Sequence, residues 1–279
     1  MNGLSNHLTH STYLSQPVFP NRVTGLHAPR SCPTDNFLGT SPGGLRRSVL
    51  ALTMIDMFSK PFLYRFRFPC EYVAAGTAVL DETYRLPNVN QMENTDLRDK
   101  LPHDFRIGWN ENGLFFSLAV AGKTQSLWCR SSQPDESDGI QICLDTRDIK
   151  DIHRASRFCH RLLFMPIGGG RDQTHPTSFW LPIHRAKEHP NSIDLAQIKM
   201  QSHVVADGYR LHVFLPGKIL TGFDPSEYPN LGFHFAVMDR EFGNSYFLIS
   251  PPLPHDQDPS LWGTLTLIHP TEPAVNGLQ

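Results

Sequence analysis

The sequence predicts an all-β protein, a β-sandwich of two mostly antiparallel sheets preceded by a disordered N-terminal extension. Three observations predict it. Short segments alternate apolar and polar residues with a period of two, which is typical of strands with one buried face. The 279 residues include 23 Pro and 20 Gly, and such frequent turn residues favour short strands over long helices. Apolar residues make up 39 % of the chain, which allows a sizeable core.

One segment shows the strand pattern most clearly. Residues 137–147 read SDGIQICLDTR, in which Ile140, Ile142 and Leu144 alternate with polar or small residues. Acidic residues lie at both ends of the segment, where a half-buried strand would pass into solvated loops. We therefore expect this strand to lie centrally in the sandwich, with the rest of the chain packed around it.

Further strands are predicted on both sides of this segment. They are Phe62–Phe68, Tyr72–Leu80, Phe105–Trp109, Leu114–Ala121, Arg157–Pro166, Ile198–Val205, Tyr209–Leu215, Gly232–Asp239, Asn244–Ile249 and Gly263–Ile268. Asn110–Gly113 is expected to close a hairpin, and Pro61 and Pro69 are expected to end the first strand. The glycines 168–170 are expected to break a strand before a long excursion over residues 171–195.

The apolar faces of these strands supply the predicted core. Its members are Phe66, Ile107, Trp109, Phe116, Ile140, Ile142, Leu144, Leu211, Val213, Phe233, Phe235 and Leu265. A shift of one residue in the pairing of any strand would turn its predicted face to solvent, so this list depends on the register.

One folded domain is expected, over residues 58–270. Residues 1–57 mix Ser, Thr, Asn, Pro, Gly and His without a sustained period, which predicts a disordered extension. Met54 and Met57 lie just before the first predicted strand, so either is an alternative native start. Residues 271–279 are expected to form a tail.

The charge and the cysteines exclude several function classes. A net charge of −2 gives no field that would attract nucleic acid or an anionic membrane, so neither is expected as a partner. The five cysteines show no C-x-x-C spacing, which disfavours both a disulfide framework and a zinc site and favours a reducing, cytoplasmic location. Arg46 and Arg47 precede only a short apolar run, which is a weak export signal.

The second half of the chain resembles a known family. Four pieces stand in order: SDGIQICLDTRD from Ser137, DGYRLHVFLPGKIL from Asp207, LGFHFAVMDRE from Leu231 and DPSLWGTLTL from Asp258. They resemble the family 9 carbohydrate-binding modules and the wider DOMON-like superfamily, most strongly over residues 137–268. The resemblance implies a non-catalytic β-sandwich that binds saccharides between aromatic rings and can hold structural calcium.

Aromatic side chains and one arginine are the candidate ligand-binding residues. Sugar recognition needs flat rings that stack on a pyranose face, with polar groups that bond the hydroxyls. The candidates are Trp128, Trp180, Tyr209 and Trp262, together with Arg161, whose guanidinium could hold a carboxylate or phosphate. Packing in the core is the alternative for each ring, since large aromatics are mostly buried. For Arg161 the alternative is an ion pair with the Asp145 region.

The acidic residues around the central strand are the candidate metal ligands. Calcium takes several oxygen ligands from carboxylates and carbonyls, and Asp135, Asp138 and Asp145 supply carboxylates in this region. Solvated loop charge is the alternative, because the spacing is not that of an EF-hand loop. No other cofactor is expected.

An enzyme is not expected. Cys159, His160 and Asp145 would be the residues of a hydrolase, but adjacent residues in a strand point to opposite faces, so Cys159 and His160 cannot form a dyad directly. The resemblance, together with the candidate aromatic residues, implies a non-catalytic binding module for a saccharide or a similar polyhydroxylated ligand. An intracellular protein-interaction or scaffold domain that has lost the sugar site is the alternative, and the sequence names no protein partner.

Overall fold

The computed structural model describes residues 65–77, 79–87, 103–251 and 253–270. In these residues the chain forms eleven strands and five short 3₁₀ turns, with no α-helix, so the predicted fold class is confirmed. The predicted extension 1–57, the tail 271–279 and the beginning of the first predicted strand lie outside the described residues.

The strands match most of the predicted segments to within a few residues. Their bounds are β1 (Arg67–Tyr72), β2 (His103–Asn110), β3 (Gly113–Ala121), β4 (Gly139–Asp145), β5 (Cys159–Gly169), β6 (His175–Trp180), β7 (Lys199–Val205), β8 (Gly208–Pro216), β9 (Asn230–Met238), β10 (Ser245–Tyr246) and β11 (Gly263–Leu267). The 3₁₀ turns are η2 (Glu82–Tyr84), η5 (Pro134–Glu136), η6 (Leu195–Gln197), η7 (Gly217–Ile219) and η8 (Pro259–Leu261).

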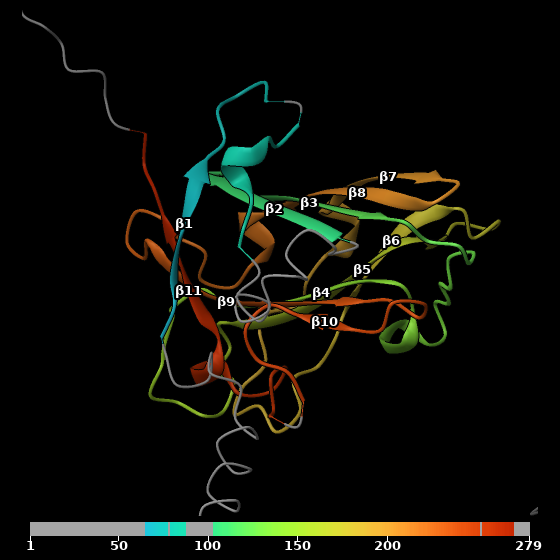
Figure 1. Ribbon diagram of the computed structural model, residues 1–279. Helices are drawn as coiled ribbons and strands as arrows, with labels where there is room; N and C mark the ends of the chain where they lie inside the picture. The colour runs from blue at the N-terminus through green and yellow to red at the C-terminus, as the bar shows by residue number, and fades with distance from the viewer. Residues whose placement is uncertain (1–64, 78, 88–102, 252, 271–279) are drawn as a thin grey trace, which may run out of the picture. The chain divides into compact units, whose positions relative to one another are not determined.

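The strands form two sheets that share β1 (Figure 1). Sheet A has the order β6-β5-β4-β9-β11-β1, with the short β10 beside β9, and sheet B has the order β1-β2-β3-β8-β7. Every pair is antiparallel except those that β1 makes with β11 and β2. As predicted, β4 lies inside its sheet, between β5 and β9.

Strand β1 passes from one sheet to the other along its length. Its residues 67–70 pair with β11, and residues 71–72 pair with β2. Pro69 lies inside this strand, so the prediction that it ends the strand is wrong. The carbonyls of Phe66 and Cys70 accept hydrogen bonds from the β11 side, which turns the nitrogen of Pro69 away from β11. No ladder hydrogen bond is lost there, because pairing with β2 begins only at Glu71.

The core lies between the two sheets and is rich in phenylalanine. Phe116 of sheet B meets Phe164 of sheet A with ring centroids 5.0 Å apart, and Phe105 meets Phe235 at 4.3 Å. The predicted core residues are buried there, with Phe66 packed against the edge of the cluster. The period of two therefore assigned the inward faces in the correct register.

Two predicted strands differ from the structure. The segment Tyr72–Leu80 is not a strand, because the chain leaves β1 at Tyr72 and turns at residues 75–76 before η2. Residues 244–249 pair only at Ser245 and Tyr246. Phe247, Leu248 and Ile249 then point into the core without forming a ladder.

The glycine triplet does not end its strand where the sequence predicts. β5 continues through Gly169, and its pairing with β6 is irregular between Met165 and Gly169. Gly168 has a φ of +111°, a backbone conformation that glycine adopts more easily than other residues. The expected excursion then returns as β6, which pairs with β5.

Among the residues that the structure describes, three histidines are buried as neutral rings. His160 and His234 are fully buried and His103 nearly so. Burial lowers the pKa of His103 to about 4, of His160 to about 4 and of His234 to about 3. An unfolded chain would protonate these rings near pH 6.5, whereas the folded chain does not. The contribution of these rings to the free energy of unfolding is therefore fully present above pH 6.5. It is lost as the pH falls from 6.5 toward the pKa values of the rings in the folded chain.

Acidification is predicted to destabilise the protein before its carboxylates titrate. Between pH 6 and pH 5, each buried neutral histidine should lower the free energy of unfolding by about 1.4 kcal/mol per pH unit. Urea unfolding followed by circular dichroism at pH 8, 7, 6 and 5 measures this slope. His234→Gln should reduce the slope by the share of one ring, about 1.4 kcal/mol per pH unit, whereas His184→Gln, at an exposed position, should leave it unchanged. A stability that is constant from pH 7 to pH 5 would contradict the burial argument.

Candidate ligand-binding groove

The outer face of sheet B presents side chains from four strands in regular rows. Because Phe116, Leu118, Leu211 and Val213 point into the core, their neighbours along β3 and β8 point outward. The strand register then sets these outward side chains opposite one another. Across β3, β8 and β7 the rows are Phe115, Phe214 and Lys199; Ser117, His212 and Gln201; and Ala119, Arg210 and His203.

The first row is aromatic. The rings of Phe115 and Phe214 are half-buried, with centroids 4.6 Å apart and planes inclined by 32°. The ammonium of Lys199 lies 6.0 Å from the centroid of Phe214. The two rings thus form an apolar platform of the kind on which the C–H face of a ring-shaped ligand can lie.

Residues 73–77 and 79–84 lie over β2 on one side of this platform, and we call them the wall. Opposite Phe115 lies Gly108, and a Cβ at this position would come within 2.5 Å of Val73 and 2.8 Å of the Tyr84 ring. The missing side chain therefore lets Val73 and Tyr84 pack directly on β2. The hydroxyl of Tyr84 donates a hydrogen bond to the carbonyl of Tyr72, 3.2 Å away, which holds this segment against the end of β1.

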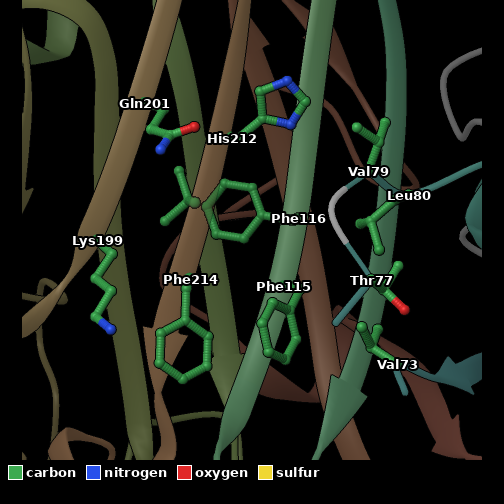
Figure 2. Close-up of a pocket in the computed structure, with 11 residues that line it drawn as sticks. Val73, Thr77, Val79, Leu80, Phe115, Phe116, Lys199, Gln201, His212 and Phe214 are labelled. Carbon is green, nitrogen blue, oxygen red and sulfur yellow. The ribbon is translucent and has the colours of Figure 1, made fainter. Parts of the chain in front are cut away.

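Two adjoining hollows lie between the wall and β7. One, of about 180 Å³, is lined by the aromatic row with Thr77, Lys199 and Gln201, and Figure 2 shows these side chains around it. The other, of about 260 Å³, lies over Ser117 and Arg210. Both are lined by Val79, Leu80 and His212. We call this continuous surface the sheet B groove.

The polar row of the groove is suited to hydroxyl groups. Burial, and then the charge of nearby Arg210, lower the pKa of His212. Its ring is therefore neutral near pH 7 and offers one donor and one acceptor nitrogen. Gln201, exposed beside it, adds an amide with both functions. The hydroxyl of Ser117, on β3, completes the row.

On the β2 side, an ion-pair network connects the wall to the floor of the groove. The guanidinium of Arg106 lies 2.6 Å from Asp104 and donates to the carbonyl of Leu80 at 3.0 Å. It also pairs with Glu82 of η2, and Arg85 lies 3.5 Å from Asp104. Two arginines and two carboxylates thus balance one another on this side.

Two of the predicted ligand-binding rings are not accessible. Tyr209 is 0 % exposed and belongs to the core cluster. Trp262 is 3 % exposed, and its indole N–H donates to the carbonyl of His255 at 2.8 Å. The prediction that these rings stack on a ligand is wrong because both are packed inside the protein, which is the alternative that the sequence left open.

Trp128 has both ring faces covered. The guanidinium groups of Arg130 and Arg240 each lie 3.9 Å from its ring. Two groups at that distance cannot share one face, so they lie on opposite faces. Cation–π contacts of this kind favour the arrangement, and a sugar could stack on Trp128 only by displacing an arginine.

Trp180 and Arg161 are also engaged with other groups. Trp180 is half-buried against the core and faces the ring of His189 edge-on, with centroids 6.3 Å apart. The guanidinium of Arg161 lies 3.0 Å from Asp256 and donates to Gln141 at 2.8 Å. In the described residues no ring contact joins any two of the four predicted aromatic residues.

Asp138 is held by a lysine. The ammonium of Lys123, buried with its partners, lies 2.6 Å from Asp239 and 3.4 Å from Asp138. The carboxylate of Asp138 also accepts the backbone N–H groups of Trp128 and Arg240, at 3.0 and 2.8 Å. This cluster ties the end of β3 to the beginning of β4 and the end of β9, and Lys123 supplies the cation that neutralises Asp138.

The other two candidate calcium ligands lie apart from this cluster. Asp145 accepts the backbone N–H groups of Arg147 and Ile149, at 3.0 and 2.9 Å, although burial raises the pKa of its carboxyl. Asp135 is exposed, 3.4 Å from Arg161. No group of three or more His, Cys, Asp or Glu residues in the described part of the chain is placed to hold a metal ion. Calcium binding stays a prediction.

Cys159 has the environment of a structural thiol. It is buried beside Cys143 and Trp262, and burial, with a smaller contribution from Asp145, raises its pKa to about 12. The thiolate that nucleophilic catalysis requires is therefore disfavoured at this position. The thiol lies 3.9 Å from the hydroxyl of Ser156, and within the described residues no hydrogen bond joins it to the ring of His160.

Sequence reasoning missed the residues of the groove. It singled out three tryptophans and Tyr209, whereas the two rings that form the platform are Phe115 and Phe214. A signal was present, because both lie on the outward, otherwise polar, faces of predicted strands. Their juxtaposition with Gly108 and Val73 follows from the pairing of β2, β3 and β8, which the sequence does not specify.

The chain is similar to several solved structures. Two of them are structures of a family 9 carbohydrate-binding module from Caldicellulosiruptor kristjanssonii, in complex with glucose and with cellotriose. They share 15 % and 16 % identity with this chain, cover 75 % of it and 98 % and 100 % of their own chains, each with a TM-score of 0.49. A candidate carbohydrate-binding protein from Bacteroides uniformis is 10 % identical, covers 74 % of this chain and 100 % of its own, and has a TM-score of 0.44.

No family model and no curated protein matches the sequence. In the described part of the chain no helix has the length and apolar character needed to cross a membrane.

The Lys123 cluster is predicted to contribute strongly to stability. Lys123→Met would leave two buried carboxylates without their cation, so the free energy of unfolding should fall by about 3–5 kcal/mol. Urea unfolding at pH 7 measures the loss. Adding Asp239→Asn to this variant removes one uncompensated charge and should restore part of the stability, whereas Lys187→Met, at an exposed position, should change it by less than about 0.5 kcal/mol. Equal stability of Lys123→Met and the native chain would contradict the assignment.

Proposed function

We propose that this chain is a non-catalytic binding module that holds a saccharide in the sheet B groove. The observation that supports it most is the aromatic row of Phe115 and Phe214, which lies beside a row of neutral hydrogen-bonding side chains. A pyranose has an apolar C–H face and a rim of hydroxyls, and binding sites for such ligands combine apolar surface with a few convergent polar groups.

The shape of the groove supports the same proposal. A sugar ring over Phe115 and Phe214 would lie against the wall at Val79 and Leu80, which line both hollows. Its hydroxyls would then meet His212 and the adjacent Gln201 and Ser117. Because the hollows adjoin one another, the groove has room for a chain of sugar units along the direction of the strands.

The alternative, a protein-interaction domain, predicts buried tryptophans and a flat apolar patch. Trp109 and Trp262 are buried, and Val204 and Val205 are exposed at the end of β7. The face of sheet B next to them, however, is hollowed and alternates apolar with polar rows, which suits a small polar ligand better than a flat protein surface.

The proposal is tested by calorimetric titration of the full chain with neutral and acidic mono- and oligosaccharides. At least one should bind with a dissociation constant in the micromolar to millimolar range. Phe115→Ala and Phe214→Ala should each weaken that binding by about tenfold, equivalent to ~1.4 kcal/mol. Gln201→Ala, on the exposed edge strand β7, removes hydrogen bonds without touching the core and should weaken it several-fold.

The control is Tyr228→Ala, which removes an exposed ring outside the groove and should leave the affinity unchanged. Thermal melting of every variant separates a loss of binding from a loss of folding. The proposal fails if no saccharide binds, or if a bound saccharide is unaffected by all three groove variants.

A further inference from the structure

Unpaired positive charge lies along one side of the sheet B groove. On the β2 side, Arg85 and Arg106 are balanced by Glu82 and Asp104. On the opposite side, β7 reads KMQSHVV and β8 reads GYRLHVFLP, and neither strand contains Asp or Glu. The cations of that side are therefore not neutralised within their own strands.

Two of these cations line the groove directly. Lys199 lines the hollow over the aromatic row, and Arg210 lines the adjoining hollow. Both side chains are exposed. Lys199 contacts the Phe214 ring, and among the described residues neither cation takes part in an ion pair, whereas Arg106 has two carboxylate partners.

The register places these cations in the two rows that flank the polar row, one on each side of it. Lys199 pairs with Phe214, Gln201 with His212, and His203 with Arg210. A ligand that lies over the platform and bonds to His212 would therefore have a cation within reach on either side of its hydroxyls. Such unpaired cations beside a binding surface favour an anionic group at that place.

We propose that the ligand of the sheet B groove is an acidic saccharide, with carboxylate, sulfate or phosphate groups held by Lys199 in one hollow and by Arg210 in the other. This inference rests on the proposed saccharide binding and assigns its substrate class. A small inorganic anion would leave the aromatic row uncovered, and a neutral sugar would leave both cations without a counter-charge. An acidic sugar unit satisfies the platform, the polar row and the cations together.

A matched pair of ligands tests the charge alone. The probes are a galacturonic acid tetrasaccharide and its methyl ester, which has the same rings and hydroxyls without the negative charge. Calorimetric titration of the full chain at low ionic strength should give about fivefold tighter binding of the acid, the preference expected from exposed ion pairs. Added salt should reduce the preference, because exposed charges are screened.

Substitution of the two cations tests the assignment. Lys199→Gln/Arg210→Gln should abolish the preference for the acid while leaving the affinity for the ester within about twofold, since the platform is intact. Arg171→Gln/Lys187→Gln removes two exposed cations outside the groove and should keep the preference. Melting curves of both double variants check their folding.

The outcomes separate this inference from the proposed function. Equal binding of acid and ester, with loss of both in Phe214→Ala, would overturn the acidic assignment and leave saccharide binding in place. Absence of binding to any saccharide would overturn both. A polyglutamate peptide that binds as tightly as the acid would overturn the saccharide assignment, since charge alone would then account for binding.

Discussion

The main-chain pairing of β1 is the constraint on which the rest of the structure depends. By pairing first with β11 and then with β2, this strand joins the two sheets at one edge and sets the position of both. The N–H of Val73 continues the pairing with a bond to the carbonyl of Trp109, at 2.7 Å. The segment that leaves β1 is thereby laid on β2, where Gly108 has no side chain to hold it away. The wall of the groove is thus a direct consequence of how β1 changes sheets.

The sequence predicted the strands and their inward faces because both depend on local alternation. Ile140, Ile142 and Leu144 are buried in the predicted register, and most strand bounds agree within a few residues. The role of Trp128 could not be predicted in this way, since Arg240, which covers one face of its ring, comes from a turn more than a hundred residues later in the chain. The same holds for Asp138, which the sequence suggested as a calcium ligand. In the structure its carboxylate is neutralised by Lys123.

Two sets of charged side chains in this protein differ in whether their charges are neutralised. Where carboxylates and cations are buried, as at Lys123, Asp138 and Asp239, they satisfy one another and stabilise the fold. In the sheet B groove, the β2 side is balanced in the same way, whereas Lys199 and Arg210 have no counter-charge on their own strands. Burial accounts for the first set of charges, and it does not account for the second. A ligand that carries negative charge and a ring face gives the second set a role.

The most direct test of this account is to map where a saccharide touches the protein. Nuclear magnetic resonance of the isotopically labelled chain, titrated with an acidic oligosaccharide, reports shift changes residue by residue. The account predicts the largest changes at Phe115, Ser117, His212 and Gln201, on the outer face of sheet B, with little change at Trp128. Changes centred on Trp128 and its two arginines, with the groove residues unmoved, would contradict it and place the ligand at the other candidate aromatic site.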